Sequence, residues 1–103
     1  MRFNVNQDIS IAKSLEKSFY LDDKYYYLSL DKIFKKSWQF IGHKSQFLGN
    51  KIIPLTLLEK SINEPIVLTT KNDAYNVLSN VCTHRGHIIS QKKCNNKTLK
   101  CTY

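Results

Sequence analysis

Two cysteines and a histidine in the last quarter of the sequence have the residue types and the spacing of metal ligands. Cys82 and His84 form a C-x-H pair, and sixteen residues separate His84 from Cys101. Thiolate and imidazole are the soft and borderline donors that zinc and iron–sulfur centres use. Side chains two apart point the same way in a strand, and at the mouth of a loop they can face neighbouring metal ions. Cys82, His84 and Cys101 are therefore the candidate ligands.

Two other interpretations of these residues stay open at this point. A tetrahedral zinc site could combine the three candidates with either Cys94 or His87, although the spacing is not that of a zinc finger or ribbon. The cysteines could also be small buried apolar residues. Cys94 lies in a polar, lysine-rich stretch, so we expect it to occupy a loop and to bind nothing. A lone histidine such as His43 is seldom a ligand.

Composition and charge limit the remaining function classes. The 103 residues suffice for one domain or part of one, and 16 basic against 8 acidic residues give a net charge of +8. Nearly all the basic residues are scattered lysines, with arginine only at Arg2 and Arg85. Because arginine dominates phosphate and base recognition, nucleic acid is not the favoured partner. No apolar run is long enough for a membrane span and no secretory signal opens the chain, so we expect a cytoplasmic location without a membrane.

The spacing of apolar residues changes from helical to strand-like near Trp38, and these predicted elements must position the candidate ligands. Before it, Ile11, Leu15 and Phe19 predict one helix behind a cap at Asp8. A second apolar stripe, from Tyr26 to Phe34, predicts another helix that Asp22 caps.

After Trp38 the pattern predicts short strands over residues 38–41, 51–58, 65–70 and 74–81, separated by turns, as in an antiparallel meander. Pro54 places its strand at an edge or marks a bulge. Trp38, Phe40 and Tyr75 are expected in the core. The fold class is therefore mainly β, or α+β with N-terminal helices.

At this level of detail the sequence resembles a known family, the α subunits of Rieske-type aromatic ring-hydroxylating oxygenases, a group that includes related monooxygenases. The resemblance rests on four segments in order, which are residues 18–20, residues 33–42, residues 64–68 and Asn80-Val81-Cys82-Thr83-His84-Arg85-Gly86. It continues in Cys101-Thr102-Tyr103, where the family shows C-x-Y-H-G.

The resemblance implies a Rieske-like antiparallel β-sandwich domain over residues 38–103, incomplete at its C-terminus, behind a helical extension over residues 1–37. It implies a [2Fe–2S] cluster with Cys82 and Cys101 on one iron and His84 on the other. The fourth ligand, a histidine, is expected beyond Tyr103. A mononuclear Fe(II) is expected in a catalytic domain outside this sequence, so no catalytic residue is assigned within it.

The resemblance also implies partners and a role. A reductase or ferredoxin would supply electrons, and the subunit would form a homo-oligomer, often a trimer. Two thiolates and two neutral imidazoles make the cluster less negative than four thiolates do, and its potential rises to roughly −150 to +300 mV. The alternatives are a stand-alone Rieske electron carrier, which the helical extension argues against, and a zinc-stapled Cys/His interaction module. The Rieske proteins of cytochrome complexes are disfavoured because His87 stands where they carry a cysteine.

Overall fold

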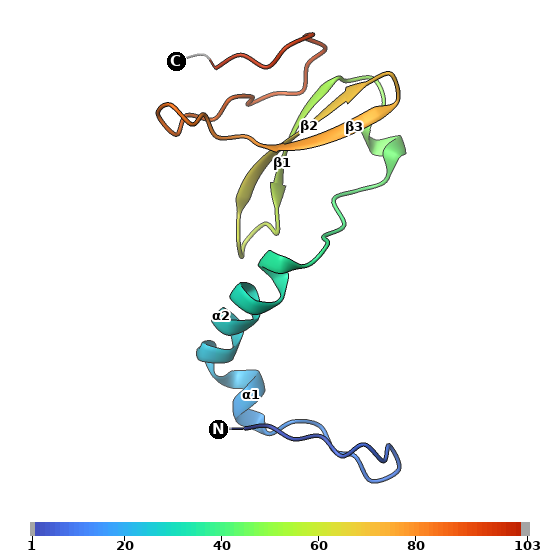
Figure 1. The fold of residues 1–103 in the computed structure, drawn as a ribbon, viewed down its shortest axis with the longest axis vertical. Helices are drawn as coiled ribbons and strands as arrows, with labels where there is room; N and C mark the ends of the chain where they lie inside the picture. Colours follow the sequence, from blue (N-terminus) through green and yellow to red (C-terminus); the bar gives the residue numbers. More distant parts are fainter. Residues whose placement is uncertain (1, 102–103) are drawn as a thin grey trace. The chain divides into compact units, whose positions relative to one another are not determined.

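The structure is a computed structural model, and it describes residues 2–101. The chain divides into two compact units, the first ending at Gln39 and the second beginning at Phe40. Figure 1 shows the helices in the first unit and the sheet in the second. Within the described residues, no helix has both the length and the apolar character that crossing a bilayer requires.

The first unit contains two short helices, α1 (Lys17–Leu21) and α2 (Asp23–Lys32), followed by a 3₁₀ turn, η1 (Phe34–Lys36). Asp22 accepts a hydrogen bond from the Lys24 N–H and caps α2, which confirms the second predicted helix and its cap. The first prediction is wrong for residues 8–16. There the Asp8 carboxylate accepts from both the N–H and the hydroxyl of Ser10, forming a local turn in place of a helix start.

Aromatic residues of the first unit are divided between one small cluster and the surface. Phe3 packs edge-on against Phe19 and Tyr25, with ring centroids 5.2 and 5.0 Å apart. Tyr26 and Tyr27 remain exposed on α2. Neither helix buries a residue, so the helices contribute little core of their own.

The segment around Trp38, where the first unit ends, has no regular secondary structure. Residues 38–41 form no strand, and the side chains of Trp38 and Phe40 are almost entirely exposed. Both the predicted strand and the predicted burial of these two residues are therefore wrong. Tyr75, which was also expected in the core, is exposed as well.

The second unit is built on one antiparallel sheet, preceded by a 3₁₀ helix, η2 (Lys44–Phe47). Its strands are β1 (Ile52–Leu57), β2 (Glu64–Lys71) and β3 (Ala74–Ser79), in the order β1-β2-β3. The mainly β class and the antiparallel meander are confirmed. Pro54 lies on β1, an outer strand of the sheet, as its missing N–H requires.

The hairpin between β2 and β3 fixes the register. Asn72 and Asp73 both adopt positive φ, 50° and 62°, which is the geometry of a type I′ turn. Asn and Asp tolerate this conformation better than other residues with a Cβ. The turn sets Lys71 opposite Ala74 and Val67 opposite Leu78.

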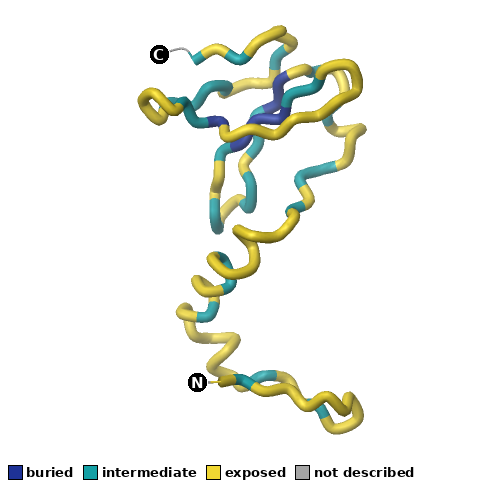
Figure 2. The backbone as a smooth tube through the Cα atoms, in the orientation of Figure 1, coloured by how far each residue is buried: buried dark blue, intermediate teal, exposed yellow. Residues whose placement is uncertain are grey.

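The core lies around the central strand, as Figure 2 shows in dark blue. Three consecutive β2 residues are buried, so both faces of that strand are covered. Ile53 of β1 and Val67 of β2 are the largest fully buried side chains. Among residues 2–101, the polar residue Asn80 is as deeply buried as the apolar core, with 2% of its surface exposed.

Candidate metal centre

The candidate ligand Cys82 lies in a short hairpin-like loop that leaves the end of β3. We call residues 81–89 the ligand loop. An isolated bridge pairs Val81 with Ile88, and the N–H of Cys82 donates to the carbonyl of His87 at 2.7 Å. The N–H of Gly86 then donates back to the carbonyl of Cys82 at 2.8 Å. Gly86 has a φ of 67°, which explains the glycine at this turn.

The side chain of Asn80 closes the base of this loop. Its amide donates to the carbonyl of Ser90 at 2.7 Å, and its carbonyl oxygen accepts from the N–H of Ser90 at 2.8 Å. The backbone of Asn80 also pairs with Pro65 and Ile89. Sequence reasoning included Asn80 in the motif but assigned it no role. A polar residue at the end of an apolar strand, two positions before a candidate ligand, was the available signal.

The sulfur of Cys82 accepts several hydrogen bonds. The backbone N–H of His84 donates to it, the thiol of Cys101 donates to it, and the N–H of Arg85 adds a third donor. These donors lower the pKa of the Cys82 thiol, in that order of importance, against the opposing effect of desolvation. Successive N–H groups around a sulfur are the environment that iron–sulfur ligands occupy in proteins. The turn over residues 83–85 therefore prepares Cys82 to act as a thiolate.

The segment after the ligand loop brings Cys101 back to Cys82. Ser90 lies beside Asn80, and Asn80 pairs with Pro65 at one end of β2. Cys94 lies beside Ile52, which pairs with Thr69 near the other end of β2. Residues 90–94 thus run along the sheet, and residues 95–101 return toward the ligand loop.

Cys94 is held at the far end of the sheet from the ligand loop. Its N–H donates to the carbonyl of Ile52, and its own carbonyl accepts from the N–H groups of Lys51 and Ile52. The four-residue step along β2 between Pro65 and Thr69 corresponds to about 14 Å. This placement favours the prediction that Cys94 is not a ligand, although the side chain is half-buried and not simply exposed.

The histidines occupy three different settings. His84 lies exposed in the turn of the ligand loop, and His87 is half-buried at its far side. His43 caps η2, with its Nδ1 hydrogen-bonded to Ser45, so it has a structural role. Across residues 2–101, no group of three or more His, Cys, Asp or Glu side chains could hold one metal ion. The structure thus brings Cys82 and Cys101 together but does not add His84 to them.

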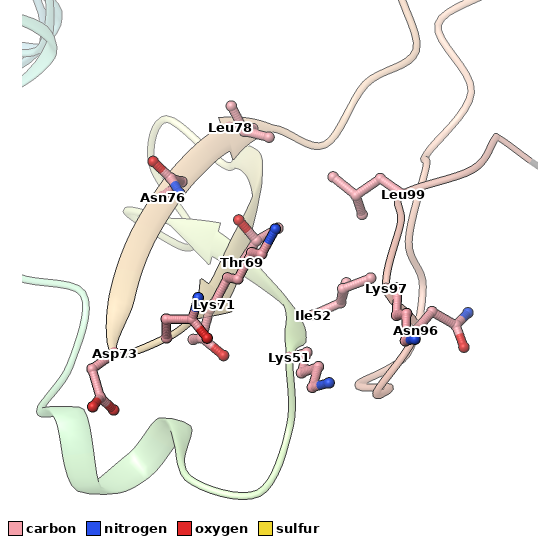
Figure 3. Close-up of a pocket in the computed structure, with 12 residues that line it drawn as sticks. Lys51, Ile52, Thr69, Lys71, Asp73, Asn76, Leu78, Asn96, Lys97 and Leu99 are labelled. Carbon is pink, nitrogen blue, oxygen red and sulfur yellow. The ribbon is translucent and has the colours of Figure 1, made fainter.

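A cavity of about 820 Å³ lies elsewhere, between one face of the sheet and the C-terminal segment. Figure 3 shows Leu99 of that segment opposite the sheet, and Ile52 lies on β1. Lys51, Lys71 and Lys97 also line the cavity. None of the three candidate ligands lines it, so it is separate from the candidate metal centre.

The comparisons with known proteins identify the family of this chain. The family model described as "Rieske [2Fe-2S] domain" matches residues 37–103. The chain belongs to the Rieske [2Fe-2S] domain family. Membership of this Rieske family implies a [2Fe–2S] cofactor and supports a role in electron transfer.

Curated relatives of this Rieske chain are α subunits of oxygenases. It is 29% identical over 90 residues to the N,N-dimethyl phenylurea N-demethylase subunit alpha of Sphingobium sp. (strain YBL2), covering 86% of the chain and 19% of that protein. It is 30% identical over 94 residues to the benzene 1,2-dioxygenase subunit alpha of Pseudomonas putida, covering 89% and 20%. It is 30% identical over 91 residues to the biphenyl dioxygenase subunit alpha of Metapseudomonas furukawaii, covering 86% and 19%.

These relatives confirm the resemblance drawn from the sequence. The chain spans about a fifth of the length of the relatives it matches. No solved structure gives a significant match.

The residues present fit the thiolate half of a Rieske cluster. A Rieske centre places two thiolates on one iron and two imidazoles on the other. Cys82 and Cys101 share a hydrogen bond, so their sulfurs lie close enough to bind one iron together. A histidine ligand such as His84 would bind the other iron and would not need to join this pair. A zinc site would need four donors around one ion, and no such group forms among the described residues.

Proposed function

We propose that this chain is the electron-entry domain of a Rieske-type oxygenase. In this proposal Cys82 and Cys101 bind one iron of a [2Fe–2S] cluster and His84 binds the other. The observation that carries the proposal is the contact between the Cys82 and Cys101 thiols, which the fold assembles from two distant segments. The family match to residues 37–103 supports it independently.

The chemistry that the bound cluster supplies is one-electron transfer at a raised potential. The protein's own contribution is positional and electrostatic. The N–H groups of His84 and Arg85 point at the Cys82 sulfur and stabilise its negative charge. Hydrogen bonds to cluster sulfurs are one of the factors that set the potential. The exposed turn presents His84 at the surface, where a redox partner can approach it.

The finer parts of the proposal follow from the relatives. The electron donor is a reductase or ferredoxin, and the acceptor is a mononuclear iron in a catalytic domain outside this chain. The subunit is proposed to form a homo-oligomer, a trimer in the simplest case, and the exposed aromatic residues of α2 and Trp38 offer apolar area for such contacts. We propose domain limits of 1–37 for the helical extension and 38–103 for the Rieske domain. A cytoplasmic location agrees with three free cysteines.

A fusion protein tests the proposed function. Residues 1–103 are joined to the part of the P. putida benzene 1,2-dioxygenase α subunit that follows the matched region. With that enzyme's own electron donors, we expect reduced nicotinamide to reduce the cluster and benzene oxidation to consume dioxygen. A matched fusion carrying Cys101→Ser is expected to lose both. A fusion that folds and binds the mononuclear iron, yet takes up no electrons, would contradict the proposed function.

A further inference from the structure

Asn80 is a buried polar residue whose hydrogen bonds connect the base of the ligand loop to the sheet. The two bonds to Ser90, at 2.7 and 2.8 Å, use its side-chain donor and its side-chain acceptor together. Its backbone N–H donates to Pro65, and its carbonyl accepts from the N–H of Ile89. With 2% of its surface exposed, Asn80 has little access to water that could replace these partners.

These four bonds join the two ends of the ligand loop to the sheet. Pro65 is on β2, so Asn80 connects the loop to the buried central strand. Ile89 is the last residue of the ligand loop, and Ser90 follows it. Cys82 lies two residues beyond Asn80, and its own N–H is already committed to His87 across the loop. Opening the base would therefore move Cys82 relative to the sheet.

The position of Cys101 does not depend on Asn80 in the same way. Cys101 reaches the site on the segment that follows Cys94, and Cys94 is bonded to β1. The two thiols are thus attached to the sheet at separate points. Asn80 holds the segment of Cys82, and the bridge between Cys94 and β1 holds the segment of Cys101. The contact between the two thiols therefore requires the hydrogen bonds of Asn80 and those of Cys94.

We propose that Asn80 is a positioning residue that closes the ligand loop and holds Cys82 where it meets Cys101. The inference rests on the proposed role of Cys82 as a cluster ligand, and it extends that role to a residue that binds no metal. A side chain with one donor and one acceptor is needed because Ser90 presents both a carbonyl and an N–H. Alanine has neither group, and aspartate keeps the acceptor but lacks the donor.

The test uses the 103-residue chain in its reduced form, with Asn80→Ala and Asn80→Asp as variants. Asn76→Ala is the matched control, because Asn76 is an exposed asparagine on β3. The first readout is amide hydrogen exchange of Ser90 compared with Thr70, whose N–H donates to Lys51 within the sheet. The second is titration with Co²⁺, whose sulfur-to-metal absorption band grows with the number of thiolates bound.

The proposal predicts a local effect in both readouts. Ser90 exchange should accelerate at least about tenfold in Asn80→Ala, while Thr70 stays within about twofold, because buried donors and acceptors lose their partners. The Co²⁺ affinity should fall by about tenfold or more, with the band reduced toward that of a single thiolate. Asn80→Asp should show a similar loss, and Asn76→Ala should match the unmodified chain in both readouts.

Three results would overturn the proposal. In the first, the Asn80 variants bind Co²⁺ through two thiolates as tightly as the unmodified chain does. In the second, Ser90 exchange is unchanged. In the third, Thr70 protection disappears in both variants, because Asn80 would then be a general core residue and not a residue of the loop. If the unmodified chain itself shows no two-thiolate band, the proposed function fails, and the exchange rates still decide the role of Asn80.

Discussion

The thiol of Cys101 donates a hydrogen bond to the sulfur of Cys82, although the two residues belong to different segments of the chain. Cys82 reaches this position through the ligand loop, which Asn80 closes at its base. Cys101 reaches it on the segment that returns along the sheet from Cys94. The proximity of these two thiols can be tested in the metal-free chain.

Mild oxidation of the metal-free chain should join Cys82 to Cys101 first. Diamide takes up the two hydrogen atoms that the thiols release as the disulfide forms, so the reaction measures proximity. Trypsin separates the three cysteines, because Arg85, Lys97 and Lys100 divide them among different peptides. Mass spectrometry should find the peptide of residues 72–85 linked to that of residues 101–103. A dominant link to Cys94 would contradict the placement of Cys94 at the far end of the sheet.

The rate at which iodoacetamide alkylates Cys82 should rise at a lower pH than for an ordinary thiol. The hydrogen bonds from His84 and Cys101 lower the pKa of Cys82, so its reactive thiolate form is more populated at a given pH. Peptide-resolved alkylation should give a midpoint below the ~8.5 of an unperturbed cysteine. Cys101→Ala removes one donor and should move the midpoint upward. A Cys82 midpoint at or above the ordinary value would show that these donors do not act on the sulfur.

The sequence predicted the sheet well because local patterns determine it. Strands 51–58, 65–70 and 74–81 correspond to β1, β2 and β3, and the Asn72–Asp73 turn carries its own conformational preference. The capped helix that begins after Asp22 follows from equally local chemistry.

The differences between prediction and structure have several physical causes. Trp38 and Phe40 were placed in the core because large aromatic residues usually gain most from burial, but both side chains are almost entirely exposed. Asn80 was the opposite case. Its position at the end of an apolar strand was a local signal, but its partners Pro65 and Ser90 are brought to it by the fold, so the sequence could not show that it closes the loop. The contact between Cys82 and Cys101 is likewise a consequence of the sheet's register and not of spacing alone.

The 103-residue chain alone should not retain a [2Fe–2S] cluster. A Rieske centre needs two thiolates and two imidazoles, and the motif residues in this chain supply Cys82, Cys101 and His84. An iron with one protein ligand keeps open positions that water fills, and such sites are labile. Supplied with iron and sulfide, the chain should stay colourless or lose its colour on gel filtration. Retention of two irons per chain would mean that His87 or Cys94 serves as the fourth ligand.

Reduction of the fusion protein by its electron donor should slow as ionic strength rises. The net charge of +8 attracts an acidic partner, and salt screens this attraction over about 10 Å at 0.1 M. Replacing Lys51, Lys71 and Lys97 with glutamate should slow reduction at low salt and flatten the salt dependence. The same exchange at Lys13, Lys17 and Lys24 of the first unit is the control for net charge. Equal effects from both triple variants would show that the total charge of the chain, and not the three lysines that line the cavity, governs the encounter with the electron donor.

The most direct test of the account is the electron paramagnetic resonance spectrum of the reduced fusion protein and of its single ligand variants. We predict the low average g value of mixed His/Cys ligation in the unmodified fusion and in Cys94→Ser. Cys82→Ser, Cys101→Ser and His84→Ala should each abolish this signal, because each removes a ligand from a fixed iron. A normal signal in any of these three variants, or its loss in Cys94→Ser, would contradict the assignment of Cys82, His84 and Cys101 as the cluster ligands.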